Sequence, residues 1–162
     1  MENIMANETV MRYQIADYLN TGTDDTEQYE LCGTGFNNLD EEPSAQIDSK
    51  IYINDKTATS YVKSYETVFP FDSDLIASEK AVMALYDVGR NHKTGADAEM
   101  DYVRVELFKP VESKENTFSA RKFRVSAEVS SISGEGGEAI AVSGNLNSVG
   151  AVSYTHLTLP TT

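Results

Sequence analysis

The chain has 162 residues, enough for one domain with a hydrophobic core. It holds 26 Asp plus Glu against 13 Lys plus Arg, a net charge of -13, and such a surface repels nucleic acid and anionic membranes. A single cysteine, Cys32, excludes an internal disulfide. No signal peptide is recognisable, and no apolar run approaches the roughly 18 residues of a membrane span. We therefore expect a protein that is made and folded in a cytosol.

The first half of the chain is predicted to form strands and turns. Residues 1–10 are polar and are expected to be flexible. Three strand segments are predicted: Tyr13–Leu19, Tyr29–Phe36 and, inside a long hairpin over 44–69, Tyr61–Phe69. Gly33 and Gly35 indicate a bulge or a close backbone approach. Turns are expected at Asn20–Asp25 and at Asn54–Thr57, where the hairpin reverses.

The segment FDSDLIASEKAVMALYDVGRN predicts the one helix. Ser78 is the candidate N-cap, and Gly89 is the expected stop. An apolar stripe at helical spacing is formed by Ala81, Val82, Leu85, Tyr86 and Val88. Asp72 and Asp74, further upstream, are an alternative cap for an early turn.

Three strands with alternating apolar residues are predicted after the helix, over 101–108, 120–130 and 139–147. A turn at Ser133–Glu138 joins the last two. With the earlier segments, this gives six or seven strands and one helix. The expected fold of residues 11–151 is therefore mainly β: two packed β-sheets, as a sandwich or partly closed barrel, with one flanking α-helix.

Two motifs suggest chemistry, and each has a simpler explanation. GTGFNN, Gly33–Asn38, begins like a dinucleotide-binding loop but lacks the third glycine and opens no helix. Cys32 and His92 would act as nucleophile and base only if the fold brought them together. A small buried thiol and a surface histidine are the simpler interpretation.

Acidic residues supply two further candidate sites. The loop after the helix holds four residues of metal-ligand type: His92, Asp97, Glu99 and Asp101. Their spacing fits no calcium loop or zinc pattern, so a solvated loop is favoured. Asp72 and Asp74 could be the paired acids of a small hydrolase, although a helix N-terminus accounts for them without an activity. The sequence therefore predicts no enzyme and no catalytic, cofactor-binding or metal-binding residue.

Several segments between Met11 and about Gly150 carry a resemblance to a known family. In chain order they are MRYQIADYLN, ELCGTGFNNLDEEPSAQ, INDKT, SYETVFPFDSDLI, SEKAVMALYDVGRNHKTGADAEMDYVRVELF, and ARKFRVSAEVSSISGE to SGNLNSVG. They resemble the major tail tube protein of long-tailed bacteriophages that infect Firmicutes and other gut bacteria. The block from Ser64 to Phe108 is the most specific part.

The resemblance implies a structural virion protein that forms hexameric rings. The rings stack into the tail tube through which DNA is delivered, and no residue is catalytic. It also implies the partners: further copies of the chain, tape measure and tail terminator proteins, and double-stranded DNA that passes without tight binding, but no membrane. The expected location is the virion tail, after synthesis in the bacterial host cytoplasm. A tube protein of a contractile injection or type VI-like secretion system is the alternative.

Two segments are candidates for assembly and for the tube's interior. The polar stretch from Asn37 to Ser60 is long for a simple connection and suits a loop that reaches a neighbouring subunit or ring. Its acids could meet a basic group further along the chain; the residues are Asp40, Glu41 and Glu42, with Arg121, Lys122 and Arg124. Ser126 and Glu128 alternate with apolar residues and are candidates to face the lumen, although Arg124 on the same face counts against this strand.

The last eleven residues, VSYTHLTLPTT, contain no charged residue. They resemble the in-frame translation of a transposase-based sequencing adapter. This resemblance implies that residues 152–162 are a non-native, artefactual tail, and we expect them to make few contacts with the domain. A genuine edge strand is the alternative.

Overall fold

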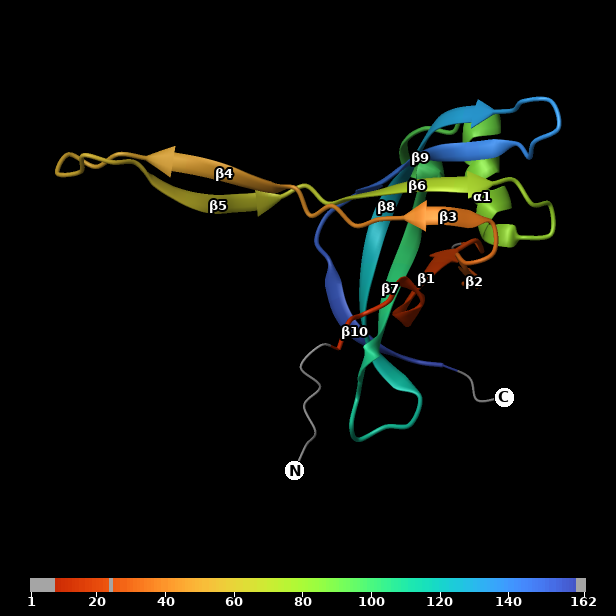
Figure 1. Ribbon diagram of the computed structural model, residues 1–162, viewed down its shortest axis with the longest axis horizontal. Helices are drawn as coiled ribbons and strands as arrows, with labels where there is room; N and C mark the ends of the chain where they lie inside the picture. The colour runs from red at the N-terminus through yellow and green to blue at the C-terminus, as the bar shows by residue number, and fades with distance from the viewer. Residues whose placement is uncertain (1–7, 24, 160–162) are drawn as a thin grey trace.

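The computed structural model describes residues 8–23 and 25–159 (Figure 1). Most of its strands form one curled antiparallel sheet, in the order β2-β1-β7-β8-β9-β6-β3 with β10 added beside β8. These strands are β1 (Ile15–Asn20), β2 (Tyr29–Leu31), β3 (Phe36–Leu39), β6 (Val68–Asp74), β7 (Glu99–Pro110), β8 (Thr117–Ser133), β9 (Ala141–Ser148) and β10 (Ser153–Thr158). The expected mainly-β, partly closed fold with one flanking helix is confirmed.

The remaining elements lie outside this sheet. Strands β4 (Ala45–Lys50) and β5 (Thr59–Tyr65) pair only with each other, as a separate two-stranded sheet. The one α-helix of the described residues is α1 (Lys80–Arg90). Short 3-10 turns, η1 (Arg12–Gln14) and η2 (Gly95–Ala98), precede β1 and β7.

The core lies between one face of the curled sheet and α1. Aromatic rings fill its centre: the ring centroid of Phe69 lies 4.7 Å from that of Tyr102 and 4.8 Å from that of Phe123. The predicted helical stripe is confirmed, since α1 buries Ala81, Val82, Leu85 and Val88. Each large apolar side chain removed from water in this way contributes roughly 1.5–3 kcal/mol.

The helix boundaries differ from those predicted. Glu79, not Ser78, occupies the N-cap position, and the helix continues through Gly89 to Arg90. A Cβ atom on Gly89 would lie 2.7 Å from Cγ1 of Val129. The glycine therefore allows close packing of α1 against β8 rather than ending the helix. Asp72 and Asp74 cap no helical turn because both belong to strand β6.

Two predicted strands are each divided in the structure. Tyr29–Phe36 separates into β2 and the start of β3, because a tight turn intervenes in which the Phe36 N–H donates to the Gly33 carbonyl at 3.0 Å. Gly35 in this turn has a φ of 99°, which favours glycine. Tyr61–Phe69 separates into β5 and β6 at Glu66 and Thr67.

Residues near the C-terminus form a strand, which corrects the expectation of few contacts. Strand β10 pairs with the Thr117–Lys122 part of β8. The hydroxyls of Thr158 and Thr117 lie 2.8 Å apart, and Leu157 packs against a small cluster formed by Val103, Val105 and Ala120. Backbone pairing on a sheet edge is open to many strand-forming sequences, so the adapter origin of 152–162 stays a prediction.

Candidate functional site

The most conspicuous feature is a hairpin, residues 45–65, that projects from the body of the molecule; we call it the arm (Figure 1). The long hairpin expected over 44–69 is therefore present, though shorter. Every residue of β5 is exposed, and Gln46 is the one residue of β4 that is half-buried. A two-stranded hairpin is only marginally stable by itself in water, so a long exposed arm points to a contact with something else.

The arm carries an exposed aliphatic pair on one face, beside the serine pair Ser49 and Ser60, and a tyrosine–aspartate contact on the other. Ile47 and Val62 are cross-strand partners and are 60% and 49% exposed. On the opposite face, the Tyr61 hydroxyl donates to Asp48 at 3.1 Å. The tip adds three further exposed apolar side chains: Ile51, Tyr52 and Ile53. Contiguous exposed apolar side chains mark interaction surfaces on soluble proteins.

Hydrogen bonds and an ion pair fix the root of the arm. Glu42 and Val68 exchange two backbone hydrogen bonds at 2.8 and 2.9 Å, which join the root to the curled sheet. Arg121 of β8 donates two hydrogen bonds to the Glu41 carboxylate at 2.7 and 2.8 Å. These bonds lower the pKa of Glu41 against the raising effect of partial burial. Ser44, with a φ of 51°, then turns the chain into β4.

A buried polar network lies behind this root. The Asp17 carboxylate accepts hydrogen bonds from the Tyr102 hydroxyl at 2.5 Å and from Arg12 at 2.6 Å. Arg104 donates to the Tyr102 hydroxyl at 2.9 Å and lies 3.7 Å from Glu41. Burial, and then the charge of Asp17, raises the pKa of Tyr102 well above its usual value. The network joins η1, β1 and β7 to the arm's root.

The basic group predicted to meet the acids of the Asn37–Ser60 stretch is paired within its own chain. Glu41 meets Arg121 as expected, but inside one subunit. The other two cations pair with acids elsewhere in the fold: Lys122 with Glu27 and Asp101 at 3.9 and 3.8 Å, and Arg124 with Glu99 and Asp101, both at 3.2 Å. These cations are therefore held by their own subunit.

The structure does not join Cys32 and His92 into a nucleophile and base. Cys32 is buried, and desolvation raises its thiol pKa well above its usual value. A nucleophilic cysteine needs the opposite shift. His92 is exposed in the turn after α1. The glycine motif Gly33–Asn38 leads into strand β3 and not into a helix, which contradicts the dinucleotide-loop interpretation.

The acidic candidates do not form a ligand cluster. Within residues 8–23 and 25–159, no three His, Cys, Asp or Glu side chains gather closely enough to hold a metal ion. Glu99 and Asp101 are instead paired with Arg124. Asp74 accepts a hydrogen bond from Asn37 at 3.3 Å. In the same described part of the chain, no helix is long and apolar enough to cross a membrane.

The face of β6, β9 and β8 that lies opposite the core carries polar side chains, and we call it the polar sheet face. By register and alternation its polar members are Asp72, Ser126, Glu128, Ser143, Asn145 and Asn147, and Val68 and Pro70 lie on the same face. The Glu128 carboxylate accepts hydrogen bonds from Asn147 at 3.0 Å and from Asn145 at 3.5 Å. Arg124, the cation that counted against this face, is paired with two acids.

Comparison with known proteins gives a structural match and no sequence match. No protein-family profile matches the chain, and no curated protein sequence does. Nine chains of solved structures match. One belongs to the cryo-EM structure of the sheath–tube complex of PVC, an extracellular contractile injection system, in its extended state. This chain superposes on the present protein with a TM-score of 0.54 and 8% sequence identity, and the match covers 95% of each chain. The protein therefore shares the fold of a chain from a contractile injection system.

Proposed function

We propose that the protein is the structural subunit of a phage tail tube, in which hexameric rings stack around a channel for double-stranded DNA. The observation that carries this proposal is the arm, which presents exposed apolar side chains away from the body. The fold match to a chain of a sheath–tube complex supports it. The tape measure and tail terminator proteins are further partners, and the virion tail is the location.

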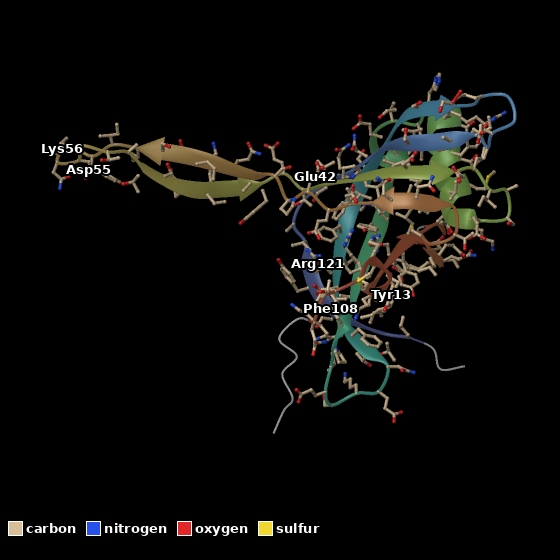
Figure 2. All side chains as sticks on the ribbon, viewed as in Figure 1. Tyr13, Glu42, Asp55, Lys56, Phe108 and Arg121 are labelled. Carbon is tan, nitrogen blue, oxygen red and sulfur yellow. The ribbon has the colours of Figure 1, made fainter. Side chains whose placement is uncertain are left out.

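The arm suits repeated self-association. It extends away from the body that bears it (Figure 2), so its apolar side chains cannot be covered by that body. A contact in which the arm of one copy meets a different surface of the next is heterologous. Such contacts generate rings where the rotation closes and filaments where it does not, which are the two geometries that a stacked tube combines.

The polar sheet face suits the wall of a DNA channel. It presents Asp72 and Glu128 among short polar side chains. DNA carries one negative charge per about 1.7 Å of its axis, so a lysine-rich or arginine-rich wall would hold it at each ring. Acidic and small polar side chains repel the phosphates and leave the duplex free to slide.

A tube protein of a contractile injection or type VI-like secretion system is a second candidate. The match to a chain of the PVC sheath–tube complex favours it. The two candidates share the fold and the tube, and differ in what passes through and in whether a sheath surrounds the tube. Neighbouring genes distinguish them, because a sheath gene beside this one supports the contractile system.

Negative-stain microscopy of the purified full chain tests the proposal. We expect tubes from the wild-type chain at high protein concentration. Replacement of residues 45–65 by a short Gly–Ser turn should give a folded monomer without tubes. A control chain with Gly and Ser at 112–115, an exposed turn in the β7–β8 connection, should still form tubes. Wild-type chains that never assemble, or tubes of normal length from the armless chain, would contradict the proposal.

A further inference from the structure

A groove of about 730 Å³ opens between the N-terminal turn and strands β1, β2 and β3. Its lining includes Met11, Tyr13 and Leu31, which are 50%, 78% and 53% exposed. Phe36 and Leu107 also line it. The groove therefore exposes a second group of large apolar side chains, separate from the arm. Its volume is within the roughly 300–1,000 Å³ of sites that enclose small ligands, which suits a few side chains rather than a whole strand.

The arm and the groove of one chain cannot meet. Figure 2 shows Asp55 and Lys56 at the end of the arm farthest from the body, whereas Tyr13 lies beside the groove on the body. The root holds the arm in this direction through Glu41 and Arg121. An occupant from the arm must therefore come from another copy.

We propose that the arm tip of one copy, Ile51–Ile53, inserts into this groove on the next copy. The inference rests on the proposed tube function and specifies both sides of one contact. The tip supplies three apolar side chains that are more than half exposed: Ile51, Tyr52 and Ile53. The groove supplies a largely apolar lining to receive them. Burial of both surfaces is favourable at roughly 25 cal/mol per Å² of apolar area.

Net charge favours contact between the arm of one copy and the body of another. The arm carries three Lys (Lys50, Lys56 and Lys63) and two Asp (Asp48 and Asp55). Subtracted from 13 Lys plus Arg and 26 Asp plus Glu, these leave 10 basic and 24 acidic residues on the rest of the chain. A slightly basic arm therefore meets a strongly acidic body, whereas two bodies repel each other. Arg12, which lines the groove, is paired with Asp17 at 2.6 Å.

A mixing experiment tests both halves of the contact. The donor-defective chain carries Ile51→Asp and Ile53→Asp, and the acceptor-defective chain carries Tyr13→Asp and Leu31→Asp. All four side chains are exposed, so the chains should fold. Each chain alone should need a concentration about tenfold or more above that of the wild type to assemble. In a mixture of the two, the intact arm of the acceptor-defective chain can bind the intact groove of the donor-defective chain. Light scattering should therefore show heterodimers that do not grow into longer assemblies.

Disulfide trapping identifies the occupant. Ile53→Cys combined with Tyr13→Cys should give a ladder of intermolecular multimers on oxidation. Both are placed in a Cys32→Ala background, because Cys32 also lines the groove and would pair with an inserted cysteine. Each single variant should stop at dimers. A double variant without the ladder, as expected if residues 1–7 of the same chain fill the groove, would overturn the inference. Wild-type-like assembly of the acceptor-defective chain would overturn it too and leave the proposed function standing. A wild-type chain that never assembles would overturn both.

Discussion

At the residue scale, the main polar feature of the interior is the hydrogen-bonded network around Asp17. Asp17 is 1% exposed and is satisfied by Tyr102 and Arg12. Buried charges are tolerated when they are paired and hydrogen-bonded. Through Tyr102 and Arg104, the paired Asp17 carboxylate helps to position Glu41 at the arm's root.

Leu85 offers a direct test of the core. It is fully buried on the face of α1 that packs on the sheet. Leu85→Ala should lower the free energy of unfolding by about 2–5 kcal/mol, through lost burial and a residual cavity. Urea denaturation measures this change. The control is Asp87→Ala on the exposed face of the same helix, which should stay within about 0.5 kcal/mol of the wild type. Equal effects from the two changes would contradict this placement of the helix.

Glu41 gives the fold a pH dependence of known sign. Hydrogen bonds from Arg121 lower its pKa from the ordinary 4.5. The contribution to stability is therefore present above pH 4.5 and is lost as pH falls through the lowered pKa of the folded state. Glu41→Gln should destabilise the chain at pH 7, and this effect should be smaller at pH 3, as measured by denaturation at both values.

The control for this test is Glu42→Gln. This change also removes one negative charge from the segment, but Glu42 is exposed whereas Glu41 is half-buried. A penalty for Glu41→Gln that is equally large at pH 3 and pH 7 would show that packing, not the charge pair, accounts for the effect.

At the element scale, β8 is the central strand, because it is long enough to pair with different strands along its length. Its first half lies between β7 and β10, and its second half pairs with β9. Helix α1 packs on the same strand near Val129, where Gly89 allows the close approach. The short strand β10 is thus attached to an element that is already held on its other edge.

Deletion of residues 152–162 tests the importance of β10. The side chains of Ser153–His156 are exposed, and Leu157 is half-buried, so the strand contributes little core. A loss of 1 kcal/mol lowers Tm by about 2–4 °C in a chain of this size, and we expect a decrease of no more than about 5 °C. A much larger decrease in a thermal melt would mean that β10 is integral to the fold.

The proposed origin of this tail is tested separately, at the level of the gene. We propose that residues 152–162 derive from adapter sequence, and resequencing of the source genome across codon 151 checks this. A natural gene that encodes VSYTHLTLPTT would overturn the proposal, whatever the deletion does to stability.

At the scale of the whole molecule, charge and shape act together. The net charge of -13 keeps bodies apart, so specific contacts must overcome repulsion to bring them together. In the contact proposed above, the slightly basic arm of one copy meets the acidic body of the next and so offsets this repulsion. The same charge distribution leaves the polar sheet face suited to a passing polyanion.

Assembled tubes should therefore show no duplex DNA binding in a gel shift at low salt. Electrostatic attraction would be strongest there, because the Debye length is about 30 Å at 0.01 M salt. A tube with Asp72→Lys and Glu128→Lys on the polar sheet face should gain binding that weakens steeply with salt. Tight, salt-sensitive binding by the wild-type tube would contradict the proposed channel wall.

Much of the local structure could be predicted from the sequence. Alternation around Phe123–Val129 predicted the middle of β8, and helical spacing of Val82 and Leu85 predicted α1. The turn at Asn54–Thr57 lies in the loop between β4 and β5, as predicted. These features depend on neighbours a few residues apart, so their pattern is visible in the chain. Composition likewise determined the net charge and the absence of an internal disulfide.

The contacts between distant segments could not be predicted in this way and are seen in the folded chain. Asp72 and Asp74 suggested a helix cap, but they lie in β6 because that strand pairs along its length with β9. Strand preference depends on such cross-strand partners more than on the residues themselves. Likewise, 85 residues of chain separate Asp17 from Tyr102, and 80 residues separate Glu41 from Arg121. No local pattern encodes these contacts, because they form only when the sheet curls around its core.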